Sequence, residues 1–152
     1  MKDQPKLNLP AFDVNLTTES EGIYIFDPIR KKNILLTPEE WVRQHFLNLL
    51  INHLHYPKGL MNVESGLTYF KKTKRSDITI NQRNQSVFML IECKSPQVKI
   101  DKKTLNQISQ YNKKIAAKFI CVTNGIKHFI WEYDLEKQAY LQQNSFPKYP
   151  EN

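Results

Sequence analysis

Apolar residues along the chain occur in short runs that polar residues, prolines and glycines separate. Two of the patterns recur every three to four residues, which is typical of amphipathic helices, and the others are short runs typical of strands. The Asn124-Gly125 dipeptide between the last two strands is a signal of a tight hairpin turn. The predicted helices cover residues 38–54 and 101–117, and the predicted strands cover residues 60–70, 75–81, 86–94, 119–123 and 127–133.

The order of these elements predicts the fold class. A short hairpin over residues 22–36, which turns at Asp27-Pro28, precedes a helix, three strands, a second helix and two strands. A helix that crosses over between strands 86–94 and 119–123 places those strands parallel in an otherwise antiparallel sheet. We therefore expect an α/β fold in which helices flank a mixed central β-sheet.

The length of 152 residues is enough for one domain with a single core. Two prolines and a polar run predict that residues 1–21 form a loosely ordered arm. Residues 22–143 are predicted to form that one domain, without internal repeats. Residues 144–152 contain two more prolines and little periodicity, so we expect a flexible tail there.

Two acidic residues and a lysine lie in consecutive predicted strands. Five apolar residues lead directly to Glu92, and Lys94 shares its face because alternate side chains of a strand point the same way. The polar segment 82–85 predicts a hairpin between the strands. With an even-numbered loop, Asp77 lies opposite Leu90 and diagonal to Glu92 on one face, so the two carboxylates converge.

Convergent carboxylates beside an ammonium group suit a hard divalent cation, because Mg²⁺ takes oxygen ligands and keeps several waters for its substrate. Lys94 can then stabilise charge on a phosphate, or help to position and deprotonate a water molecule. The alternative is an ordinary surface ion pair between Glu92 and Lys94, worth about 0–1 kcal/mol. Spacing alone favours that alternative, because an aspartate followed by Glu-x-Lys is a loose pattern.

A family resemblance adds to these observations. Asp77, the segment Ile91-Glu92-Cys93-Lys94, and the pair Gln107 and Tyr111 resemble the PD-(D/E)xK nuclease superfamily, most closely the N-terminal nuclease domain of type I restriction enzyme R subunits. Ser76 stands where the superfamily name has proline. Further similar elements are Thr37-Pro38-Glu39-Glu40-Trp41-Val42-Arg43-Gln44, His55-Tyr56-Pro57, Glu64 and Thr123-Asn124-Gly125, so that the likeness covers residues 22–134.

The resemblance implies a restriction-endonuclease-like core with the order α-βββ-α-β and an N-terminal hairpin. It also implies cleavage of DNA with Mg²⁺, for which Mn²⁺ can substitute. Asp77 and Glu92 are the implied metal ligands, the Cys93 carbonyl is a possible third, and Lys94 is the implied base or charge stabiliser. Gln107 and Tyr111 lie four apart on one helix face, where they can bond phosphate or base edges, although without the upstream Glu-x-Lys segment ordinary packing is the favoured explanation of such a pair.

Such nucleases often contribute another acid from the first helix, and two residues compete for that role. Helical geometry puts Glu39 near the middle of the apolar face, whereas the resemblance favours Glu40 as a metal ligand. Glu40 also has a structural explanation, since Thr37-Pro38-Glu39-Glu40 is a capping-box pattern in which Glu40 reaches back to the cap. Glu64 is a weaker candidate of the same kind.

The charge of the chain supports DNA as a partner. The net charge is +7, which suits a polyanion. Two basic clusters flank the three candidate residues and could grip phosphates, although a solvated basic face is the usual role of such runs. The clusters are Lys71, Lys72, Lys74 and Arg75 before Asp77, and Lys99, Lys102 and Lys103 after Lys94.

Other features limit the function classes. The chain has four glycines and no phosphate-binding loop of the G-x-x-x-x-G-K-[ST] kind, so any ATP-driven translocation would have to come from another chain. A separate motor or methylation subunit is a possible partner. Cys93 and Cys121 fall in apolar runs and are expected to be buried thiols, and the four histidines lack zinc-ligand spacing. No apolar stretch is long enough to cross a membrane, so we expect a cytoplasmic protein. The alternatives to a nuclease are a non-catalytic nucleic-acid-binding or assembly module that keeps the nuclease fold, and an adaptor that recruits another subunit.

Overall fold

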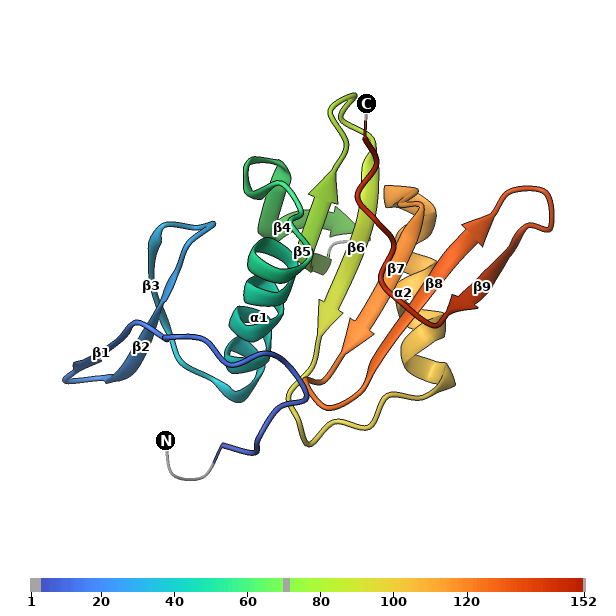
Figure 1. Cartoon of the computed structure of the whole chain (residues 1–152). Coiled ribbons are helices and arrows are strands. Elements are labelled where there is room, and N and C mark those ends of the chain that lie inside the picture. The colour runs from blue at the N-terminus through green and yellow to red at the C-terminus, as the bar shows by residue number, and fades with distance from the viewer. Residues whose placement is uncertain (1–3, 70–71, 152) are drawn as a thin grey trace.

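The structure is a computed structural model that describes residues 4–69 and 72–151, without the side chains of residues 64–76. In this part of the chain, two α-helices and nine strands form a mixed α/β architecture (Figure 1). The helices are α1 (Pro38–Asn48) and α2 (Lys102–Ile115), with a π-helical turn at Leu49–His53 and a 3₁₀ turn at Lys58–Leu60. The strands are β1 (Leu16–Glu19), β2 (Gly22–Asp27), β3 (Lys32–Leu35), β4 (Met61–Tyr69), β5 (Lys72–Asn81), β6 (Val87–Cys93), β7 (Phe119–Thr123), β8 (His128–Asp134) and β9 (Ala139–Gln143).

The strands form two sheets. β1, β2 and β3 make a small antiparallel sheet, and β4 to β9 make a six-stranded sheet in sequence order. β6 and β7 run parallel, with Met89 opposite Phe119, and the other registered pairs of the large sheet run antiparallel. The predicted mixed sheet and its parallel pair are therefore confirmed, as is the hairpin that turns at Asn124-Gly125.

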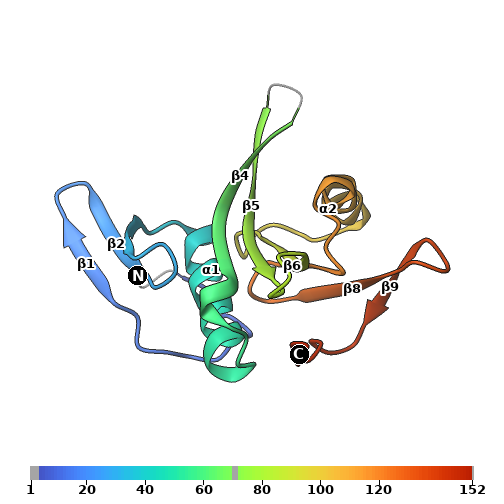
Figure 2. The same ribbon diagram turned by 90° about the horizontal axis from the view of Figure 1, so that it is seen from above.

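Helix α1 lies between the two sheets, and α2 covers the opposite face of the large sheet (Figures 1 and 2). Alternate side chains of β6 point to opposite faces of the large sheet, so the core has two parts, one on each face. Met89 and Ile91 pack with Phe46 and Leu50 of the first helix region, whereas Leu90 packs with Ile108 of α2. Because sheets cover α1 on two sides, even its polar residues are largely buried.

The start of α1 follows its sequence signals only in part. Thr37 is the N-cap and accepts the Glu40 N–H at 3.0 Å, and Pro38 occupies the first turn. The Glu40 side chain does not complete the expected capping box, because both of its oxygens bind arginines instead. The α-helix also ends at Asn48, where the π-helical turn takes over, rather than continuing to residue 54.

The two ends of the chain pack more closely than their composition suggests. The segment expected to be a loose arm contains β1, which enlarges the predicted hairpin to three strands, and Leu7, which is buried in the core. The expected flexible tail crosses the large sheet (Figure 1). There Phe146 and Tyr149 pack against the core, and the Tyr149 hydroxyl donates to the Asn81 carbonyl at 2.8 Å.

The β5–β6 hairpin is present, but its register differs from the expected one. Leu90 lies opposite Thr79, not opposite Asp77, and the last registered pair is Ile78 with Ile91. The difference is two residues: β6 has one extra residue at the irregularity between Ile80 and Asn81, and the turn between Asn81 and Val87 has an odd number of residues rather than an even one. The pairing stops at Ile78 and Ile91, so Asp77 and Glu92 each lie one residue beyond its end, on two strands that separate there.

Candidate functional site

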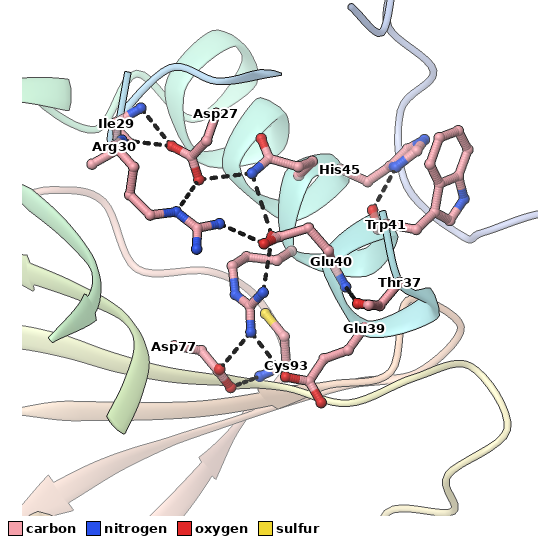
Figure 3. Close-up of polar contacts among 12 residues, drawn as sticks. Asp27, Ile29, Arg30, Thr37, Glu39, Glu40, Trp41, His45, Asp77 and Cys93 are labelled. Carbon is pink, nitrogen blue, oxygen red and sulfur yellow. Dashed lines mark hydrogen bonds and ion pairs between the residues drawn. The ribbon is translucent and has the colours of Figure 1, made fainter. Parts of the chain in front are cut away.

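Asp77 lies where β5 and β6 separate, and it joins three elements. Its Oδ2 accepts the Cys93 N–H of β6 at 2.6 Å, in place of a backbone partner from β5. Its Oδ1 accepts from Arg43 Nη2 of α1 at 2.8 Å (Figure 3). Both oxygens of the carboxylate are thus engaged by groups of the protein itself.

Arg43 is the central cation of this region. Its Nη1 donates to Glu40 Oε2 at 2.8 Å, and its Nη2 donates to Glu39 Oε1 at 2.9 Å as well as to Asp77. The side chain is only 3% exposed, so its charge is acceptable there only because acids surround it. Burial lowers the pKa of Arg43, but the charges of Asp77 and Glu40 have the opposite effect. The net shift of the pKa is upward, so Arg43 stays charged.

The ion pairs continue from Arg43 to the small sheet. Arg30 Nη2 donates to Glu40 Oε1 at 2.6 Å, and Arg30 Nε donates to Asp27 Oδ2 at 2.8 Å. Burial raises the pKa of Asp27, but hydrogen bonds from Arg30 and Gln44 outweigh this effect and lower it. Acids and bases alternate along this chain, which we call the buried charge chain: Asp27, Arg30, Glu40, Arg43 and Asp77.

Glu92 and Lys94 form a separate ion pair at the end of β6. Lys94 Nζ lies 2.9 Å from Glu92 Oε1, and both side chains remain partly exposed. The Lys94 N–H donates to the Thr123 carbonyl at 2.8 Å, which extends the pairing of β6 with β7 and fixes the backbone below the ammonium group. The ion pair predicted from sequence is therefore present.

The pKa of Lys94 depends on acids of β5 and α1 as well as on its neighbour Glu92. Burial is the largest single effect and lowers the pKa of Lys94, but the hydrogen bond and charge of Glu92 together with the charges of Asp77 and Glu39 outweigh it, so the pKa is raised. Lys94 is therefore an ammonium ion at neutral pH. Burial raises the pKa of Asp77 to about 6, against the opposing effect of Arg43 and the Cys93 N–H.

The two first-helix acids are placed very differently. Glu40 is buried, and its two oxygens bind Arg30 and Arg43. The Glu39 side chain is 47% exposed and shares Nη2 of Arg43 with Asp77. Glu39 is thus the acid with freedom to reach a ligand beside Asp77. The side chain of Glu64 lies outside the described residues.

The remaining sequence candidates lie on α2, in the loop before it and on or next to β5. Tyr111 is buried against the α2 face of the sheet, whereas Gln107 is exposed one turn earlier on α2. Among the basic residues, Lys99, Lys102 and Lys103 are exposed in the loop after β6 and the first turn of α2. Lys71 lies outside the described residues, and Lys72, Lys74 and Arg75 belong to β5 with side chains that are not described.

The donor atoms near Asp77 have the chemistry of a magnesium site, although their number is small. Among the described side chains, which leave out residues 64–76, no group of three or more His, Cys, Asp or Glu could hold a metal ion. Mg²⁺ needs fewer, since it is bound through one or two carboxylates, retained waters and substrate phosphate. Asp77 and Glu92 are the two carboxylates at this end of the hairpin, and cations of the protein, Arg43 and Lys94, bind them.

Arg43 is the main residue that sequence reasoning missed. A signal for it was present, because Glu39 and Glu40 precede it by four and three residues, the spacing of helical ion pairs. Its position among the apolar residues Val42 and Phe46 also indicated a buried cation that needs acids from elsewhere.

The fold and the site define a class: an α/β domain that places an acid of one strand beside a Glu-x-Lys pair of the next, below a helix that supplies further acids. Residues 38–147 match the family of the type I restriction enzyme R protein N terminus (HSDR_N), and the chain belongs to this family. The chain is also similar to a solved fragment assigned to the HsdR subunit of a type I restriction enzyme from Vibrio vulnificus YJ016. That likeness has 22% sequence identity and a TM-score of 0.43, and it covers 58% of this chain and 19% of the other. No curated protein matches the chain.

None of the helices in the described residues combines the length and the apolar character that crossing a membrane requires.

Proposed function

We propose that this chain is a metal-dependent DNA phosphodiesterase domain with a restriction-endonuclease-like fold. The observation that carries the proposal is the convergence of charge where β5 and β6 separate. Asp77 and Glu39 both act on the pKa of Lys94, although they belong to a strand and a helix that are distant in sequence. Family membership supports the assignment, since the family is named for a subunit of restriction enzymes.

In this proposal Asp77, Glu92 and the Cys93 carbonyl hold Mg²⁺ or Mn²⁺, with Glu39 as the helix acid nearest to them. A metal bound there would polarise the scissile phosphate and lower the pKa of a water molecule. Lys94 keeps its proton at neutral pH, because Glu92 and Asp77 raise its pKa. Its role is therefore to stabilise negative charge on the phosphate rather than to act as the base.

DNA is the proposed substrate because exposed lysines follow the site directly. Lys99, Lys102 and Lys103 lie between the end of β6 and the first turn of α2, where they can contact phosphates beside the scissile bond. We assign the basic residues at the start of β5 to the same interface. Gln107, exposed on α2, is the member of the helical pair that can bond DNA, whereas the buried Tyr111 supports the helix.

We further propose that this domain works with a separate motor or methylation subunit. The name of the family refers to an R protein of a type I enzyme, of which this domain would be one part. The cytoplasmic location stays a prediction from the sequence.

The direct test is cleavage of plasmid DNA by the purified chain with Mg²⁺ or Mn²⁺. Lys94→Ala should abolish nicking and leave the circular dichroism spectrum unchanged. Lys118→Ala is the matched control, because Lys118 also faces a glutamate, Glu132, at 3.9 Å but lies at the far end of α2. Equal nicking by the wild type and Lys94→Ala would show that the site is not responsible for the activity.

A second candidate function is a non-catalytic nucleic-acid-binding module with the same fold. The observation that favours it is that internal cations already neutralise both acids, Arg43 on Asp77 and Lys94 on Glu92. This candidate predicts DNA binding that weakens steeply with salt, and no cleavage with any divalent metal.

A further inference from the structure

We propose that Arg43 is an internal competitor of the metal ion, a guanidinium group that holds Asp77 in the metal-free protein and must release it when a divalent cation binds. The inference rests on the proposed function, because it concerns the same site. It adds a residue that controls metal affinity from α1.

The geometry makes the two cations exclusive at Asp77. Arg43 Nη2 lies 2.8 Å from Oδ1, and the Cys93 N–H occupies Oδ2 at 2.6 Å. Mg²⁺ binds a carboxylate oxygen at about 2.1 Å. A metal on Oδ1 would therefore stand next to a buried positive charge, and the repulsion between like charges is strong where little water screens it.

The surroundings of Arg43 allow it to leave Asp77 at low cost. The same Nη2 already donates to Glu39 Oε1 at 2.9 Å, and Nη1 donates to Glu40 Oε2 at 2.8 Å. When Asp77 is lost as a partner, two acids still neutralise the guanidinium. No unpaired buried charge is created, which would otherwise oppose the exchange.

The ion pair with Glu40 holds the Arg43 guanidinium in place beside α1. The other oxygen of Glu40 accepts from Arg30 at 2.6 Å, and Arg30 is tied to Asp27 of the small sheet. The buried charge chain thus anchors Arg43 from the side opposite to Asp77. The competition concerns the contact between Arg43 and Asp77.

The experiment is a calorimetric titration of the full chain with Mn²⁺ and with Mg²⁺. Arg43→Lys keeps the charge but loses the planar fork that reaches Glu40 and Asp77 at once, so its hold on Asp77 is weaker. We expect metal binding to become about fivefold tighter or more. Arg83→Lys is the matched control, the same substitution at an exposed arginine in the turn between β5 and β6, and its metal affinity should stay within about twofold of the wild type.

Unchanged or weaker metal binding in Arg43→Lys, with binding by the wild type intact, would overturn the role of Arg43 and leave the proposed nuclease site standing. No binding by either protein would overturn the metal site itself. A readout that needs no variant is the NMR signal of the Arg43 guanidinium in the wild-type protein. Its Nη groups should rotate faster as Mg²⁺ saturates the site, and slow rotation at saturation would contradict the exchange.

Discussion

The stability of the Asp77→Asn variant, measured as the difference from wild type, should increase as the pH rises. Burial raises the pKa of this carboxyl group to about 6, from an ordinary value of 3.8. The folded state therefore binds the Asp77 proton more tightly than the unfolded state does. The stability that neutral Asp77 contributes is complete below about pH 4 and is lost as the pH rises through 6.

The magnitude follows from the two pKa values. A difference of about two pKa units corresponds to about 3 kcal/mol between the ionised and neutral forms. Only 13% of the Asp77 side chain is exposed, so solvent screening reduces this figure little. Asparagine cannot ionise, and it therefore avoids the loss between pH 4 and pH 7.

The assay is urea denaturation of wild type and Asp77→Asn at pH 4 and pH 7, with a chelator present to remove divalent metals. The free energy of unfolding of the variant, minus that of the wild type, should increase by about 2–2.5 kcal/mol between the two pH values, because part of the full effect is already lost at pH 4. Asp13→Asn, at an exposed position in the N-terminal segment, controls for the change of net charge. A constant difference, or one that moves in favour of wild type at pH 7, would mean that the Arg43 ion pair outweighs burial.

Substitutions at two positions with positive φ should change the free energy of unfolding in opposite directions. Urea denaturation measures both changes. Gly125 has a φ of +85°, and a Cβ there would lie 2.7 Å from Leu7 Cδ2 and 3.1 Å from Val42 Cγ2. Gly125→Ala should therefore lower the free energy of unfolding by about 1–3 kcal/mol, and an unchanged value would refute the close packing of the N-terminal segment. Ala116 ends α2 with a φ of 58°, so Ala116→Gly should raise the free energy of unfolding by about 1 kcal/mol, and a decrease would refute the left-handed cap.

The order of elements around the site could be predicted because each has a local signal. Alternating or continuous apolar runs marked β5, β6 and β7, and the helix between the last two required their parallel pairing. β9 was missed, since residues 139–143 are mostly exposed and have no strong apolar pattern. The irregularity at Ile80 and Asn81 left no trace in the residue types, and it contributed to the shift in register between β5 and β6.

The side chains around Asp77 were less predictable than the backbone, because their partners come from elements distant in sequence. The pair of Glu92 with Lys94 follows from strand alternation alone. The attachment of Arg43 to Asp77 spans 34 residues and depends on how α1 packs on the sheet. The role of Glu40 changed for the same reason, since the arginine that binds its second oxygen belongs to the turn after β2.

The most direct test of the central claim, that Asp77 and Glu92 share a metal ion, is a crystal structure of the chain soaked in Mn²⁺ with anomalous scattering data. The account predicts an anomalous peak at coordination distance from one oxygen of each carboxylate, with Arg43 withdrawn to Glu39 and Glu40. A saturating soak that shows no peak, with Asp77 still bound to Arg43 and Glu92 still bound to Lys94, would contradict it.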